Sequence, residues 1–132
     1  MKVLVLLIAL FVCFLLSSGA KVDAAPCLVV TLTGTQSGPS VFNGQAGAGT
    51  LVQYGDDLDN CAAMNLLFDT GRGTNMRLSQ LKITPNQLNA VFLTHMHGDH
   101  TEGLPDIMML RWYMKGRKLD IVCSSDEFRC WG

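Results

Sequence analysis

The sequence lacks an excess of either charge. Its 132 residues include 10 lysines and arginines against 11 aspartates and glutamates, which gives a net charge of −1. A protein that binds nucleic acid through the phosphates usually carries a clear positive excess. A chain of this length allows at most one domain. The composition therefore predicts one small domain without a specific nucleic-acid footprint.

Three further patterns are missing from the sequence. The five cysteines show no Cys-x-x-Cys spacing, so a structural zinc site built on cysteine is not expected. The glycine-rich residues 43–49 are not followed by Gly-Lys-Ser/Thr, so we interpret them as a turn rather than a phosphate-binding loop. The acidic residues 55–60 lack the regular spacing of calcium ligands. A solvated turn is the interpretation that we favour for them.

A long hydrophobic run occurs only at the N-terminus. Lys2 precedes the apolar residues 3–16, and small residues follow at 17–20. An early cation, a short apolar core and small residues before a cleavage point indicate a secretory signal peptide, which we assign to residues 1–24. The apolar run is short for a membrane span, so no stable span is expected. The sequence therefore predicts a secreted or periplasmic protein, with an uncleaved anchor as the alternative.

Export changes what the cysteines indicate. Cys27, Cys61, Cys123 and Cys130 remain after the assigned signal peptide. An even number of cysteines in an oxidising compartment predicts at least one disulfide bond. Three complete pairings are open, and the spacing does not choose among them. Buried free thiols are the alternative.

The middle of the chain alternates between strand and helix patterns. Short runs of β-branched and apolar residues predict strands at 28–32, 50–54, 65–69, 90–94 and 119–123. Helical spacing predicts helices at 74–82 and 105–115 and a short helical turn at 86–88. Because hairpins come first and strand–helix alternation follows, we expect an α/β fold with a mixed sheet covered by helices on one face.

All three histidines lie within six consecutive residues, between an apolar strand and a helix. His95 and His97 are two positions apart, so on an extended chain both rings project to the same side and suit one metal ion. Asp99 and His100 leave the following glycine turn in new directions and suit a second ion. Imidazole and carboxylate are ligands for zinc, iron or manganese. The pattern predicts half of a two-metal hydrolytic site.

These residues resemble the signature of the metallo-β-lactamase superfamily, His-x-His-x-Asp-His after a buried strand. The resemblance covers about residues 28–123. Residues 31–40, 67–74 and 100–105 are similar to the branch of the superfamily that contains ribonuclease Z and the arylsulfatases. The resemblance implies half of a metallo-β-lactamase αββα sandwich, formed by residues 25–132 as the N-terminal part of a truncated domain.

The resemblance also implies roles for individual residues. His95 and His97 would bind the first metal ion, and Asp99 and His100 the second, with two Zn²⁺ in a complete site and Mn²⁺ or Fe²⁺ as alternatives. Asp99 would in addition orient or deprotonate the nucleophilic water. Asp69 matches an aspartate that supports the site, and a carboxylate that hydrogen-bonds a ligand histidine is physically sensible there. A helix N-cap is the alternative role for Asp69.

Two departures from the superfamily pattern affect this interpretation. Arg72 replaces the glutamate that is common in the ribonuclease Z loop, which argues, together with export, against tRNA processing. The superfamily completes its site with further histidines and a bridging aspartate downstream, whereas no histidine follows His100. We therefore expect a truncated product that is inactive by itself.

The full-length protein is expected to be an exported, dinuclear-zinc hydrolase. It would act through metal-activated water on a phosphodiester, sulfate ester or related ester, and its partner would be a small-molecule or phosphodiester substrate. The alternatives are a ribonuclease Z-type 3′ tRNA-processing endonuclease, a catalytically incomplete metal-binding fragment and a secreted interaction module. A homo-oligomer also stays open. The secreted interaction module would bind its partner through an exposed apolar face of Met108, Met109, Trp112 and Met114, although we favour core packing for these side chains.

Overall fold

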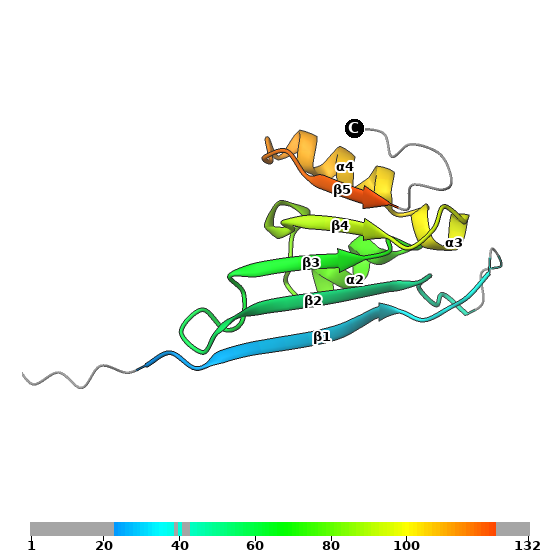
Figure 1. The fold of residues 1–132 in the computed structure, drawn as a ribbon. Helices are drawn as coiled ribbons and strands as arrows, with labels where there is room; N and C mark the ends of the chain where they lie inside the picture. Colours follow the sequence, from blue (N-terminus) through cyan, green and yellow to red (C-terminus); the bar gives the residue numbers. More distant parts are fainter. Residues whose placement is uncertain (1–22, 39, 41–42, 124–132) are drawn as a thin grey trace, which may run out of the picture.

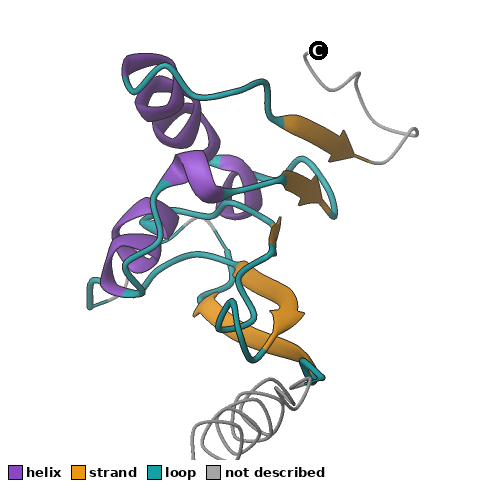
Figure 2. Ribbon diagram, turned by 90° about the vertical axis from the view of Figure 1, so that its left-hand side faces the viewer, coloured by secondary structure: helices purple, strands orange, loops and turns teal. Residues whose placement is uncertain are grey.

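The computed structural model describes residues 23–38, 40 and 43–123. They form one five-stranded sheet with helices on one of its faces (Figure 1, Figure 2). The signal peptide predicted at 1–24 lies outside the described residues except for its last two positions. Among the residues that the structure describes, no helix is both long enough and apolar enough to cross a membrane.

The sheet has the order β1-β2-β3-β4-β5. Its strands are β1 (Pro26–Gly34), β2 (Gly49–Asp56), β3 (Met64–Phe68), β4 (Ala90–Leu93) and β5 (Asp120–Cys123). The first three strands pair antiparallel, whereas β4 and β5 join in parallel. Residues 35–48 connect β1 to β2, the turn at residues 57–63 connects β2 to β3, and helical crossovers connect the parallel strands. The predicted α/β fold with a mixed sheet is confirmed, and each predicted strand overlaps an observed one.

The helical segments follow the sheet in the second half of the chain. They are α2 (Thr74–Gln80), the 3₁₀ turn η1 (Pro85–Gln87), α3 (Gly98–Thr101) and α4 (Leu104–Tyr113). The predicted helices and the predicted helical turn overlap α2, α4 and η1. Helix α3 was not predicted, because four residues are too few to show a helical period.

The core lies between the sheet and the helices. Leu51, Leu67 and Val91 occupy one row across β2, β3 and β4, and all three are fully buried. Leu78 of α2 and Ile107 of α4 are also fully buried and belong to the same cluster. Apolar burial of this kind is the main stabilising contribution to folding. It fixes α2 and α4 against the sheet and so holds the segment between β4 and α4 in place.

The other face of the sheet is apolar and exposed. In β1, Leu28 is 63% and Leu32 is 65% exposed. The strand register continues this surface from Leu28 to Tyr54, and Phe68 stacks on Phe92 with ring centroids 4.8 Å apart. The structure is thus a sheet covered on one side only, which is the half sandwich expected from the sequence.

Helix α4 differs from the expectation. Its buried residues are Ile107 and Arg111, which lie four positions apart and face the rest of the protein. Met109 is 62% and Trp112 is 76% exposed, and Met108 and Met114 are exposed as well. These four side chains lie away from the buried side of the helix, so the preference for core packing was wrong for the described structure.

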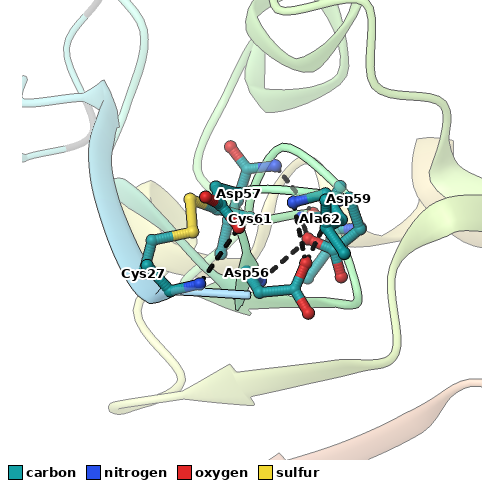
Figure 3. The surroundings of a disulfide bond; sticks show 10 residues. Cys27, Asp56, Asp57, Asp59, Cys61 and Ala62 are labelled. Carbon is teal, nitrogen blue, oxygen red and sulfur yellow. Dashed lines mark hydrogen bonds between the residues drawn. A yellow bond between two sulfur atoms is a disulfide. The ribbon is translucent and has the colours of Figure 1, made fainter. Parts of the chain in front are cut away.

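A disulfide bond joins Cys27 in β1 to Cys61 in the turn after β2 (Figure 3). The prediction of at least one disulfide is confirmed, and this pairing is now assigned. The acidic turn beside it contains Asp56 and Asp59, whose Oδ1 atoms accept hydrogen bonds from backbone N–H groups of the same turn. The two carboxylates therefore stabilise the turn itself, in agreement with the preferred interpretation of residues 55–60.

Candidate functional site

The histidine turn lies at the carboxyl end of the parallel strands. β3 and β4 are paired in parallel, so the residues that follow them meet at the same edge of the sheet. Asp69 follows β3, and its backbone N–H donates to the carbonyl of Phe92 in β4 at 2.8 Å. The segment from Thr94 to α3 follows β4 (Figure 1). This is the edge at which open α/β sheets usually bind ligands.

The turn brings the three imidazole rings together. The ring centroids of His95 and His97 are 4.5 Å apart, in an edge-to-face arrangement. Those of His95 and His100 are 4.0 Å apart, with tilted planes. Two of these residues precede α3 and the third lies within it, so the start of the short helix gathers the rings. The three predicted histidine ligands thus form one cluster.

Asp99 lies beside this cluster. Its Oδ2 is 3.5 Å from Nε2 of His100 and accepts a hydrogen bond of 2.8 Å from the backbone N–H of Gly38. The Gly38 hydrogen bond is the largest cause that lowers the pKa of Asp99, and the charges of His100 and His97 add to this effect while burial opposes it. Asp99 is therefore a carboxylate at neutral pH.

Asp69 connects the site to the neighbouring strand. Its Oδ2 lies 2.8 Å from Nδ1 of His100, and its Oδ1 accepts a hydrogen bond of 2.8 Å from the backbone N–H of Thr94. The hydroxyl of Thr94 also contacts both carboxylate oxygens, at 3.0 and 2.9 Å. Asp69 is not the N-cap of α2, because that position belongs to Gly73. The alternative role for Asp69 as a helix cap was therefore wrong.

The backbone of the loop after β3 holds α3 in place. Thr70 donates from its N–H to the carbonyl of His100 at 2.7 Å, and its own carbonyl accepts the N–H of Gly103 at 2.7 Å. A Cβ at Gly71 would overlap the carbonyl oxygen of Asp99 and the backbone of Gly47 and Ala48. Only glycine allows this close approach between the loop and the histidine turn.

Arg72 and Glu102 form an ion pair at the rim of the site. The Nη2 of Arg72 lies 2.6 Å from Oε2 of Glu102, and both side chains are about one third exposed. An ion pair of this exposure contributes about 0–1 kcal/mol to stability. The arginine that departs from the ribonuclease Z pattern is thus paired with a carboxylate immediately after the histidine turn.

The donor chemistry of the site suits a transition metal such as zinc. The Oδ2 of Asp69 accepts a hydrogen bond from the Nδ1–H of His100, which would leave Nε2 of His100 as the nitrogen available to a metal. The Nδ1 of His95 lies 3.0 Å from the hydroxyl of Thr94, which leaves its Nε2 for a metal. Within the described residues, no three His, Cys, Asp or Glu side chains converge as a set that would hold an ion. The three imidazoles are clustered and Asp99 lies beside His100, but the four side chains do not converge on one point, and their role as ligands stays a prediction.

Sequence reasoning missed the contribution of Gly38 and of Thr94. Gly38 is 61 residues away from Asp99 in the chain, so no local spacing pattern could have indicated their hydrogen bond. Thr94 entered the sequence analysis only as the last residue of the predicted strand 90–94, although its amide and hydroxyl both bind Asp69. The signal for Thr94 was its place directly after a buried strand, beside the carboxylate that ends the preceding one.

Comparisons with known proteins give consistent matches. The family described as "Anti-Pycsar protein Apyc1" matches residues 41–129. Ribonuclease Z of Mycobacterium sp. (strain KMS) is 40% identical over 83 residues, which are 63% of this chain and 26% of that protein. Ribonuclease Z of Ligilactobacillus salivarius (strain UCC118) is 42% identical over 53 residues, or 40% of this chain and 17% of that protein. The chain thus spans about a quarter or less of the length of these relatives.

Solved structures also resemble the chain. The metallo-β-lactamase fold protein YhfI from Bacillus subtilis superposes with a TM-score of 0.64 and 25% sequence identity, over 78% of this chain and 38% of that one. A diphosphatase from the PhnP family superposes with a TM-score of 0.53 and 20% identity, over 72% of this chain and 41% of that one. The second likeness concerns the fold alone.

Proposed function

Because the chain belongs to the family of the anti-Pycsar protein Apyc1, in the ribonuclease Z branch of the metallo-β-lactamase superfamily, we propose that it carries half of the active site of a metal-dependent hydrolase. The substrate is a phosphodiester, sulfate ester or related ester. The phosphodiester is the first choice, because the relatives named ribonuclease Z cleave such bonds in RNA.

The observation that carries this proposal is the contact between His100 and Asp69. A histidine that binds a metal usually donates its other ring N–H to a carboxylate, which fixes the ring and raises its basicity as a ligand. The distance of 2.8 Å between His100 Nδ1 and Asp69 Oδ2 has this form. His100 is therefore prepared as a ligand through Nε2, beside the other two imidazoles and Asp99.

The residues have distinct tasks in the proposed site. His95 and His97 hold one ion, and Asp99 and His100 hold the other. Two such ions, when bound, would lower the pKa of a water at the site and would stabilise the negative charge that develops on the ester oxygens. The pKa of Asp99 is lowered, so its carboxylate is a weak proton acceptor at neutral pH. In the proposed site Asp99 would help to hold the second ion and would orient or deprotonate the nucleophilic water.

We also propose that the protein acts outside the reducing cytoplasm. The support is the Cys27–Cys61 disulfide, because such bonds persist mainly in secreted and periplasmic proteins. The apolar run at residues 3–16 supports the same proposal.

A second candidate function is 3′ tRNA processing. The identity of about 40% with two ribonucleases Z favours it. The balanced charge of the chain and the proposed export favour the first candidate instead. Cleavage of a precursor tRNA, with no turnover of a small phosphodiester, would identify 3′ tRNA processing as the function.

The test of the proposed site is zinc binding by the chain, measured by competition with a chromogenic chelator. Replacement of His97 by alanine or of Asp99 by asparagine should weaken zinc binding. Asp106→Asn is the matched control, because it removes an exposed carboxylate from the next helix. Equal zinc affinity in all of these variants would contradict the site. Turnover of bis(p-nitrophenyl) phosphate and p-nitrophenyl sulfate by a complete enzyme that carries these residues then decides the ester class.

A further inference from the structure

A cavity of about 390 Å³ lies at the amino ends of β4 and β5. Its walls are η1 with the two residues after it, and the loop 115–118 between α4 and β5. Because β4 and β5 run in parallel, this is the end of the sheet opposite to the histidine turn (Figure 1). The cavity is therefore separate from the site proposed above.

The lining of this cavity is strongly cationic. It contains Arg111, Lys115, Arg117 and Lys118, and no aspartate or glutamate is among the described residues that line it. Within the described part of the chain, no ion pair joins any of these four side chains to an acid. Four positive charges around one cavity repel each other, and a bound anion would offset part of this repulsion.

Arg111 makes the walls of the cavity rigid. Its side chain is 6% exposed, and its guanidinium donates hydrogen bonds to the carbonyls of Pro85 and Leu88 on one wall and of Arg117 and Lys118 on the other. These acceptors satisfy the N–H groups but carry no full charge. Burial lowers the pKa of Arg111, yet arginine stays protonated in proteins. A buried positive charge without a carboxylate thus lies under the cavity.

A second cavity adjoins the first on the other side of the same loop. Its volume is about 280 Å³, and it shares Arg111, Gly116, Arg117 and Lys118 with the first. Its remaining lining is apolar and consists of Met108, Trp112, Leu119 and Ile121. Trp112 is 76% exposed, so its ring is accessible for stacking. The cationic first cavity therefore adjoins a second cavity that is lined partly by apolar and aromatic side chains.

We propose that the two adjoining cavities bind a small phosphorylated molecule, with its phosphate among the cations of loop 115–118 and its apolar or aromatic group beside Trp112. Lysine and arginine are the side chains that recognise phosphate by charge and by hydrogen bonds. The volume of the first cavity, about 390 Å³, is at the lower end of the range for small-molecule sites. The site needs no metal and is independent of the proposed hydrolytic function.

The first experiment compares two anions on the metal-free full chain. Phenyl phosphate and inorganic phosphate are titrated by calorimetry with EDTA present and at constant ionic strength. We expect phenyl phosphate to bind with a Kd of about 1 mM or below and inorganic phosphate to bind more weakly, because only the former reaches Trp112. Absence of saturable phenyl phosphate binding would overturn the proposal.

Matched variants locate the site. The double variant Lys115→Gln/Lys118→Gln should weaken phenyl phosphate binding about tenfold, the effect of ~1.4 kcal/mol. Its control, Arg77→Gln/Lys82→Gln, removes two cations elsewhere and should change little. Equal losses in both double variants would show non-specific attraction by net charge and would refute the site.

Trp112→Ala should remove the preference for phenyl phosphate over inorganic phosphate. Tyr113→Ala is its control, because Tyr113 is 80% exposed and lies outside both linings. His97→Ala should leave binding unchanged, so failure of the proposed hydrolase site does not affect this result. Loss of binding in His97→Ala, or binding only to vesicles that contain phosphatidic acid, would overturn the proposal.

Discussion

The Nδ1 of His100 lies 2.8 Å from Oδ2 of Asp69, and this contact joins the end of β3 to α3. The same carboxylate binds the amide of Thr94, directly before the first histidine of the turn. Asp69 therefore contacts both ends of the segment from Thr94 to His100. Its φ of +61° is left-handed, a conformation that aspartate adopts more readily than most side chains but that is uncommon outside glycine.

This arrangement predicts a hierarchy of zinc affinities. His95→Ala or His97→Ala removes a ligand outright, whereas Asp69→Ala removes a partner of a ligand and should cost about 10–100-fold in affinity. We therefore expect the two histidine variants to lose more affinity than Asp69→Ala in a chelator competition titration. A larger loss for Asp69→Ala would reverse the assignment of ligand and support.

Close backbone packing predicts the effect of a small change at Gly71. A methyl group there would overlap the carbonyl oxygen of Asp99, so Gly71→Ala should displace the turn and destabilise the fold by about 1–3 kcal/mol. Zinc affinity should fall with it. The control is Gly44→Ala, where a Cβ meets nothing within 4 Å and only the φ of +67° opposes the change. Unchanged zinc binding in Gly71→Ala, measured beside denaturant midpoints, would contradict this packing.

The sequence could predict the position of the histidine turn because its information is local. His95, His97, Asp99 and His100 lie within six positions, and an apolar strand before them fixes their place at a sheet edge. The hydrogen bond from Gly38 to Asp99 is not local, because it joins a residue shortly after β1 to a residue of α3. Local spacing carries no information about such a contact.

The same distinction explains the fold. The strands were predicted well because apolar runs and turn residues alternate along the chain. The exposure of Met109 and Trp112 was not predicted, because a hydrophobic side chain shows only that it favours burial. Whether another element covers it is a property of the assembled layers. For the same reason, the sequence could not show that the apolar outer face of the sheet, at Leu28 and Phe92, is left uncovered.

The lowered pKa of Asp99 predicts a pH dependence for the metal-free protein. Because the pKa in the folded state lies below the ordinary value of about 3.9, the unfolded state binds more protons as the solution becomes acidic. The stabilising contribution of Asp99 is therefore present above about pH 4 and is lost as pH falls through the folded pKa. Urea midpoints in EDTA should decline less steeply with acid in Asp99→Asn than in the wild type. Parallel declines would show that Asp99 gains nothing from Gly38.

The disulfide predicts a measurable stabilisation. Cys27 and Cys61 are 34 positions apart, and closing a loop of this length contributes about 2–4 kcal/mol, mainly through the unfolded chain. Cys27→Ser/Cys61→Ser should lower the free energy of unfolding by this amount. Thiol counting under denaturing, non-reducing conditions gives the independent check. Equal stability of the double variant and the oxidised wild type would show that the bond is dispensable.

The last prediction concerns the activity of the 132-residue chain by itself. The described residues bring together two candidate ligands for each of two ions, whereas a catalytic zinc usually has three protein ligands and a water. Two close cations also repel each other, and a bridging carboxylate normally offsets this. The isolated chain should therefore retain at most about one zinc ion, weakly, as elemental analysis after dialysis would show.

The isolated chain should also show negligible turnover of bis(p-nitrophenyl) phosphate. The apolar outer face, with Leu32 65% exposed, adds a tendency to associate or aggregate that light scattering would detect. Two tightly held ions together with turnover that disappears in Asp99→Asn would contradict this expectation. In that case a second copy of the chain would be supplying the missing ligands, and the same light-scattering measurement would show a defined oligomer.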